Sequence, residues 1–191
     1  SKHSAQLRKE LIMHVLLVYA TWTGTTRQVA EAIGRRLEAG GAQVTLSEAS
    51  KVKDVTSYDA VVVGHSVHAG KLARHALKFD KHFAAELAHK PVAWFLLSLT
   101  MATDTPENRS KAMVYLEDAQ KAAPQVHPVA IGLFGGAVLR DTEEYGKLNP
   151  VVKGIANIVA KTDATDHRDW AAIDAWAESL MPLFQRERVL A

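Results

Sequence analysis

Apolar residues follow two alternating patterns along the chain. Short continuous apolar runs are typical of strands that are buried on both faces of a parallel sheet. Between them lie stretches in which apolar residues recur every three or four positions, as they do in a helix with one buried face. The first run covers residues 14–20, and residues 27–39 then show helical spacing, with Val29 and Ile33 on one face. This alternation predicts a strand, a turn and a helix at the start of the fold.

Further units of the same kind follow toward the end of the chain. The predicted strands are residues 14–20, a short strand around 44–46, and 60–64, 92–97 and 128–135. The predicted helices are 27–39, 71–87, 106–123 and 168–186, the last of which is expected to bury Trp170, Ile173, Trp176, Ala177 and Leu180. Strands that alternate with helices form parallel sheets covered on both faces. The expected fold class is therefore α/β, a three-layer sandwich around a five-stranded parallel sheet.

The sequence predicts one domain with an extension and an insertion. Residues 1–12 contain neither a strand pattern nor a strong helical pattern, and we treat them as an extension outside the fold. The domain covers residues 13–191 and includes an insertion at about 139–166. Within the insertion, Asn149-Pro150 predicts a turn into a helix. That helix carries Val151, Val152, Ile155, Ile158 and Val159, with Lys147, Lys153 and Lys161 around them.

The helix of the insertion has two interpretations. An apolar face flanked by lysines can lie on a membrane surface or cover an apolar substrate. The same pattern describes a helix packed on the domain's own core, which is the commoner arrangement.

The turn after the first strand is rich in hydroxyls. It consists of Thr21, Trp22, Thr23, Gly24, Thr25 and Thr26. Because a helix start offers unpaired N–H groups and a partial positive charge, a strand, a hydroxyl-rich turn and a helix in this order can cradle a phosphate. The Gly-Lys-Ser/Thr ending of a triphosphate loop and the three spaced glycines of a dinucleotide site are both missing. The turn suits one terminal monophosphate, although threonines that merely cap a helix give the same composition.

Two later loops are expected at the same edge of the sheet, because ligands of such folds bind where the carboxyl ends of parallel strands meet. The loop after the third strand contains Ser66, Val67, His68, Ala69 and Gly70. They offer polar groups, a ring that can stack on a ligand, and a glycine that permits positive φ. The loop after the fourth strand contains Ser98, Leu99, Thr100 and Met101, which combine hydroxyls with apolar cover for a flat ligand. An exposed histidine and a capped turn are the simpler interpretations, but three such loops together favour a ligand site.

Composition narrows the chemistry. The 191 residues contain no cysteine, which excludes disulfides, thiolate metal sites and cysteine nucleophiles. The nine histidines lack the spacing of a metal site, and no catalytic set of serine, histidine and carboxylate is evident. A formal net charge of +2 does not indicate a nucleic-acid partner. No apolar run is long enough to span a membrane, so a cytoplasmic protein is expected.

The sequence resembles known flavoproteins in several places. Residues 21–26, in the pattern Thr-x-Thr-Gly-x-Thr, resemble the FMN-phosphate loop of flavodoxins. Other segments resemble the flavodoxin-type, quinone-dependent protoporphyrinogen oxidases; they are 64–70, 95–101, 135–139, 162–166 and Asp169-Trp170. The resemblance extends over about residues 13–185. It departs from the family at Trp22 and Thr23, where relatives often have charged or small residues, and in a less basic insertion.

This resemblance implies a flavodoxin-like fold that binds FMN and serves as an oxidoreductase in heme biosynthesis. Electrons would pass from a small apolar substrate such as a porphyrinogen through the flavin to a quinone. A homo-oligomer and peripheral contact at the inner face of the membrane are compatible with it. The alternative is a flavodoxin-type electron carrier without its own substrate, and a third class is a flavin- or phosphate-binding module without turnover. The weak net charge and the long insertion count against the carrier.

Overall fold

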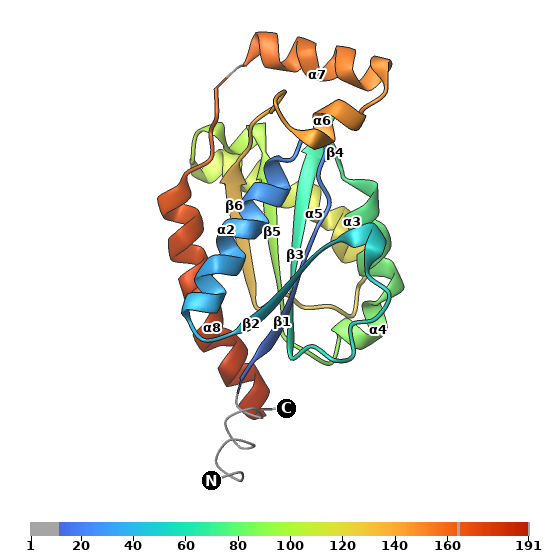
Figure 1. The fold of residues 1–191 in the computed structure, drawn as a ribbon. Helices are drawn as coiled ribbons and strands as arrows, with labels where there is room; N and C mark the ends of the chain where they lie inside the picture. The colour runs from blue at the N-terminus through green and yellow to red at the C-terminus, as the bar shows by residue number, and fades with distance from the viewer. Residues whose placement is uncertain (1–11, 164, 191) are drawn as a thin grey trace.

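A mainly parallel sheet runs through the centre of the computed structural model (Figure 1), which describes residues 12–163 and 165–190, the last three without their side chains. Five parallel strands lie in the order β2-β1-β3-β5-β6, and a short sixth strand, β4, pairs antiparallel with the end of β3. Their bounds are His14–Tyr19 (β1), Gln43–Glu48 (β2), Ala60–His68 (β3), Lys71–Leu72 (β4), Val92–Ser98 (β5) and Ala130–Gly135 (β6). The predicted α/β class is confirmed, with β4 as an additional strand.

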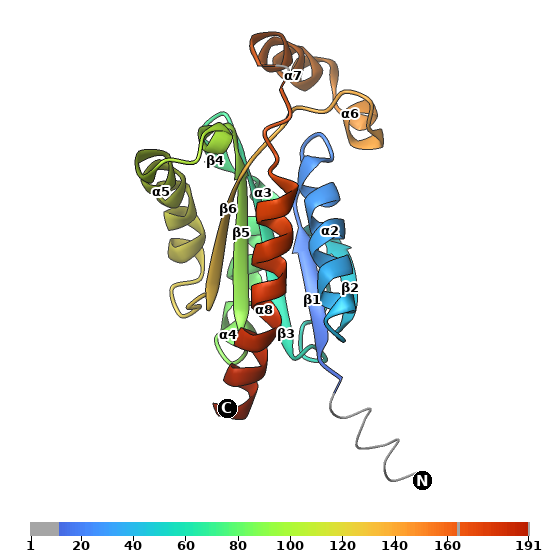
Figure 2. The same cartoon turned by 90° about the vertical axis from the view of Figure 1, so that its left-hand side faces the viewer.

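Helices cover both faces of this sheet (Figure 2). One face carries α2 (Thr25–Ala39) and α8 (Trp170–Leu190), and the other carries α3 (Arg74–His82), α4 (Ala84–Leu87) and α5 (Pro106–Ala122). Short 3-10 turns, η1 (Ala49–Lys51) and η2 (Leu99–Ala102), follow β2 and β5. The insertion forms α6 (Glu143–Lys147) and α7 (Pro150–Thr162), which lie beyond the carboxyl ends of the strands, at the top of Figure 1.

Two buried clusters hold the three layers together. In β1, Leu16 and Val18 belong to the cluster under α3 and α5, whereas Val15 and Leu17 belong to the cluster under α2 and α8. Successive side chains of a strand point to opposite faces, and here both faces are covered. This explains why the strand reads as a continuous apolar run.

The end of β3 differs from the prediction. The predicted strand 60–64 is too short, because β3 continues to His68, and residues 66–68 are therefore strand rather than loop. The chain then reverses through a two-residue turn at Ala69 and Gly70, whose φ angles are +48° and +75°. Turns with positive φ at both central residues match the twist of paired strands. The result is a hairpin that projects from the carboxyl edge of the sheet.

This hairpin also shortens the helix that follows it. The predicted helix 71–87 is wrong at its start, because Lys71–Leu72 is the returning strand β4 and α3 begins only at Arg74. It is also wrong in its middle, because Phe83 adopts φ −102° and ψ 15° and separates α3 from α4. The helical spacing of apolar residues persists across the break and conceals it in the sequence.

The last helix buries most of the expected side chains but not the first of them. Ile173, Ala177 and Leu180 are buried, and Trp176 is partly buried against the same cluster. Trp170 is 41% exposed, so its predicted burial is wrong. It stands at the first position of α8, where its ring lies 4.8 Å from the guanidinium carbon of Arg168 instead of the core.

The insertion contains the predicted helix. Asn149 caps α7 by accepting the N–H of Val152 at 3.0 Å, and Pro150 occupies the first turn. Ala156 and Ala160 of α7 are buried, whereas Val151, Ile155 and Ile158 are exposed. Apart from Ile12, the predicted extension 1–12 lies outside the described residues, as does Ala164 of the insertion. No helix of the described part combines the length and apolar character needed to cross a bilayer.

The insertion leaves and rejoins the domain at neighbouring points. The N–H of His167 donates to the carbonyl O of Gly136 at 3.1 Å, and the N–H of Gly136 donates to Ser98 at 3.1 Å. A Cβ on Gly135 would lie 2.1 Å from the carbonyl O of His167. Glycine therefore lets the returning chain cross directly over the end of β6.

Candidate functional site

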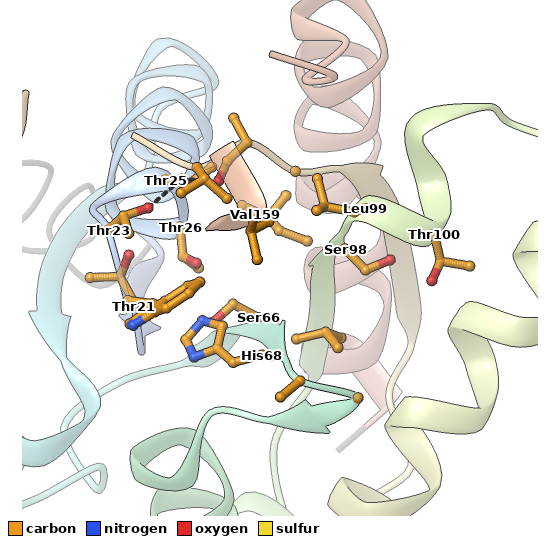
Figure 3. A pocket seen from close by; sticks show the side chains of 18 of the residues that line it. Thr21, Thr23, Thr25, Thr26, Ser66, His68, Ser98, Leu99, Thr100 and Val159 are labelled. Atoms are coloured by element: carbon orange, nitrogen blue, oxygen red, sulfur yellow. Dashed lines mark hydrogen bonds between the residues drawn. The ribbon is translucent and has the colours of Figure 1, made fainter. Parts of the chain in front are cut away.

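A cavity of about 280 Å³ lies at the carboxyl edge of the sheet, between the strand ends and α7 (Figure 3). It is lined by the turn after β1, the end of β3 and its hairpin turn, the start of η2, α5, the segment after β6, and α7. The lining residues are Thr21, Trp22, Thr23, Thr25, Thr26, Ser66, Val67, His68, Ala69, Gly70, Leu97, Ser98, Leu99, Thr100, Tyr115, Gly136, Ala137, Val138, Ile155 and Val159. The volume is near the lower end of the range for small-molecule sites.

The turn after β1 shapes the start of α2. Gly24 stands at the N-cap with φ +91°, and its N–H donates to Oγ1 of Thr21 at 3.0 Å. The positive φ of Gly24 favours glycine, and a Cβ there would lie 2.7 Å from a carboxylate oxygen of Glu144, which would have to shift. The first turn of α2 contains no acidic residue, and no side chain caps it. Its first N–H groups and the positive end of the helix dipole can therefore serve an anion beside Thr25 and Thr26.

Besides the hydroxyl of Thr21, those of Thr23 and Thr25 already have partners in the protein. Thr25 Oγ1 donates to the carbonyl O of Ala137 at 2.9 Å. Thr23 Oγ1 accepts the N–H of Leu139 at 3.2 Å and lies 3.4 Å from Thr25 Oγ1, so its own proton can be donated to Thr25 or to a ligand. Thr25 would thus offer a ligand its backbone N–H rather than its hydroxyl proton.

A pair of rings forms one side of the cavity. The rings of Trp22 and His68 lie 4.7 Å apart between centroids at an interplanar angle of 40°. Nε2 of His68 is 3.2 Å from Oγ of Ser66, which also contacts the carbonyl O of Ala20 at 3.2 Å. Burial lowers the pKa of His68 to about 4, because removal from water disfavours the charged imidazolium. The imidazole is therefore neutral at physiological pH and can exchange hydrogen bonds with a neutral ligand.

The opposite side combines hydroxyls with apolar groups. Ser98 Oγ is buried, and no partner for it exists among the described residues. Thr100 Oγ1 lies 3.4 Å from the Tyr115 hydroxyl. Val159 of α7 faces these groups across the cavity (Figure 3). A buried hydroxyl without a partner is costly, so Ser98 is a natural contact for a polar ligand edge.

The lining carries no formal charge at neutral pH. It contains no aspartate, glutamate, lysine or arginine, and the pKa of about 4 keeps His68 neutral. Within the described residues there is also no group of three or more histidine, aspartate or glutamate side chains that could hold a metal ion. The site is therefore suited to binding a ligand whose own chemistry does the work.

The cavity brings together most of the residues that the sequence singles out. Gly24 and Met101 are the exceptions: Gly24 faces Glu144, and the 4%-exposed Met101 packs in the core and does not line the cavity. Lining residues that the sequence does not single out for the site are Leu97, Tyr115, Gly136, Ala137 and Val138. Ile155 and Val159 lie on the insertion helix, for which covering an apolar substrate was one of the two interpretations.

The strand order defines the class of the protein. Strand β1 lies between β2 and β3, and in doubly wound sheets of this order ligands bind at the carboxyl ends of the strands where the order reverses. The described cavity occupies that position. The molecule is thus a flavodoxin-like α/β protein. A family model described as a flavodoxin domain matches residues 16–168, and the chain belongs to this family.

Individual relatives are distant. The chain is 26% identical over 113 residues to the protoporphyrinogen IX dehydrogenase [quinone] of Escherichia coli (strain K12). The matched segment covers 56% of this chain and 62% of that protein. The match therefore spans less than two thirds of the relative's length.

Similar solved structures are flavodoxins. A short-chain flavodoxin associated with a bacterial microcompartment has a TM-score of 0.53 and 18% identity, over 79% of this chain and 99% of that one. Oxidised Flavodoxin 2 from Bacillus cereus has a TM-score of 0.50 and 23% identity, over 78% and 99%. At these identities the likeness shows the fold alone.

Proposed function

We propose that this chain binds FMN in the cavity and is an FMN-dependent oxidoreductase, passing electrons from a small apolar substrate through the flavin to a quinone. One observation carries the proposal. A single uncharged cavity joins a hydroxyl-rich helix start, suited to a monophosphate, to an apolar compartment that extends to α7. A flavin mononucleotide combines those two chemistries in one ligand, with one phosphate and one flat, largely apolar ring.

The proposed phosphate contacts lie in the turn before α2. Thr21, Thr23 and Thr26 would offer hydroxyl groups, and Thr25 its backbone N–H, to an anion at the positive end of the helix. Arg27 does not line the cavity, because its guanidinium contacts Glu31 and Glu144. Neutral donors of this kind suit a monophosphate better than a triphosphate.

The proposed ring contacts come from the other loops. The buried Ser98 hydroxyl lacks a partner, which fits a polar edge of the isoalloxazine ring, and Trp22 and His68 can cover its face. Bound FMN would supply the transfer of electrons between donor and acceptor. The protein would orient the ring, and Ile155 and Val159 of α7 would exclude water from it.

The proposed substrate compartment lies on the α7 side of the cavity. Leu99 and Ile155 line the cavity and are also 36% and 48% exposed, so they form an apolar entrance. Such an entrance suits an apolar substrate such as a porphyrinogen. The name of the Escherichia coli relative supports this choice, and the same name supports a quinone as acceptor.

The outer face of α7 suits contact with a membrane surface. Val151 and Ile158 are 73% and 66% exposed, and Lys161 lies on the same helix. Apolar side chains beside a lysine favour the interface of an anionic bilayer. We propose that this face brings the entrance close to a membrane-dissolved quinone.

An absorption titration with FMN, followed by anaerobic turnover, tests the function. We expect stoichiometric FMN binding and reduction of the bound flavin by protoporphyrinogen without a partner protein, followed by reoxidation by a soluble quinone. If FMN binds but only a reductase protein reduces it, the electron-carrier alternative is the better account. Absence of FMN binding would refute both.

A further inference from the structure

A short segment at the start of the insertion forms hydrogen bonds with the turn that we assign to the phosphate. This segment, residues 137–144, is here called the clasp. Besides the contacts of Thr25 with Ala137 and of Leu139 with Thr23, Oγ1 of Thr142 donates to the carbonyl O of Thr23 at 2.7 Å. The same Oγ1 accepts the N–H of Tyr145 and so begins α6. The clasp therefore joins the insertion to the turn through backbone and side chains.

An ion pair completes the clasp. Arg27, in the first turn of α2, donates through Nε to Oε1 of Glu144 and through Nη2 to Oε2, the second contact at 3.3 Å. The Arg27 side chain is 29% exposed and that of Glu144 19%, so the pair is partly shielded from water. The bond to Arg27 is the main reason that the pKa of Glu144 lies below its usual range, which keeps the carboxylate ionised.

Arg27 has a second carboxylate partner that provides a matched comparison. Its Nη1 lies 2.8 Å from Oε1 of Glu31, one turn further along the same helix. Loss of Glu31 would remove a contact within α2, whereas loss of Glu144 would remove one of the contacts between the insertion and α2. Substituting Glu31 or Glu144 therefore removes one carboxylate partner from the same guanidinium.

We propose that Thr142 and Glu144 are positioning residues for the phosphate of the cofactor. Neither lines the cavity, so they act through Thr23, Gly24 and Arg27, holding the turn in the conformation that binds phosphate. The insertion then governs how long FMN stays bound, in addition to any contact with substrate. This inference rests on the proposed function.

The test compares Glu144→Gln with Glu31→Gln, and Thr142→Val with Thr142→Ser. Stopped-flow release of FMN, binding of riboflavin, and hydrogen exchange of the flavin-free protein are measured for each variant. Thr142→Val keeps the branched shape of the side chain but removes the hydroxyl, whereas Thr142→Ser keeps the hydroxyl and removes the methyl group. The pair therefore separates loss of the hydrogen bond from a change of shape. The amide of Gln28, which donates to the carbonyl O of Gly24 at 3.1 Å, reports on the first turn of α2.

We expect Glu144→Gln and Thr142→Val to release FMN roughly fivefold faster than wild type. Riboflavin, which lacks the phosphate, should bind all variants equally, and Gln28 should exchange faster in these two variants alone. Three results would each overturn the inference while FMN binding by the wild type stands. They are FMN release from the two variants at the wild-type rate, a loss of riboflavin affinity as large as the loss of FMN affinity, and unchanged hydrogen exchange at Gln28. A wild type that binds no FMN would instead refute the proposed function, and this inference with it.

Discussion

The neutral histidine of the cavity predicts a pH-dependent stability that can be measured without any ligand. In the folded protein the pKa of His68 is lowered to about 4, whereas an exposed histidine has the ordinary value of 6.5. As pH falls below 6.5, the unfolded chain takes up a proton at this side chain and the folded protein does not. Protonation therefore favours the unfolded state. The free energy of unfolding begins to fall near pH 6.5, and this contribution is fully lost below pH 4.

The size of the effect follows from the two pKa values. The difference between 6.5 and about 4 corresponds to a total loss of about 3 kcal/mol. Between pH 7.5 and pH 5, about 2 kcal/mol of that total is lost, since most of the unfolded chain is protonated at pH 5. Other ionisable groups also change with pH, so the quantity of interest is a difference between proteins.

Urea unfolding at pH 7.5 and pH 5 measures this difference. His68→Gln removes the titrating ring, so its free energy of unfolding should fall by about 2 kcal/mol less over this interval than that of the wild type. Ser66→Ala should keep the full wild-type fall, because burial rather than the 3.2 Å contact with Ser66 lowers the pKa of His68. Equal falls in wild type and His68→Gln would show that the ring is hydrated in the folded protein, which would refute the lowered pKa of His68.

Three other predictions concern the phosphate turn, the hairpin and the centre of the sheet. Replacing Thr23 and Thr26 together by valine should weaken FMN binding at least tenfold in a fluorescence titration, since hydrogen bonds to a charged group contribute about 1.5–3 kcal/mol each; unchanged affinity would disprove the phosphate assignment. Ala69→Gly should raise the free energy of unfolding by up to about 1 kcal/mol, because φ of +48° is unfavourable for alanine, and a lower melting temperature would contradict this. Gly64→Ala should destabilise the protein by about 1–3 kcal/mol, since its Cβ would lie 2.3 Å from Phe95; in urea unfolding Phe95→Leu should recover part of that loss, and strict additivity would count against the clash.

The sequence was most informative where one element is buried on both faces. The apolar runs that include Leu16 and Val62 predict strands buried on both faces, and such strands form a parallel sheet between two helical layers. The hydroxyl-rich turn likewise locates one end of the cavity, because turns that follow parallel strands meet at one edge of the sheet.

Local patterns in the sequence do not predict contacts that depend on the tertiary fold. The two residues of β4 are too few for a period, and the pairing of Lys71 with His68 depends on a turn that places alanine at positive φ. Met101 has the same composition signal as Leu99, yet one is buried in the core and the other stands at the cavity. For Trp170, helical spacing predicts burial, yet the ring lies beside the neighbouring Arg168 and is exposed.

The two ends of the insertion lie next to each other in the fold. Gly136 and His167 are hydrogen-bonded neighbours, so the chain between them can change length without pulling on the sheet. The entropic cost of closing such a loop grows slowly, by about 0.6 kcal/mol for each doubling of its length. Transplanting residues 137–166 between related scaffolds would carry Ile155 of the proposed entrance together with the clasp. If both proposals hold, we expect the rate of FMN release and the choice of substrate to change in a single exchange.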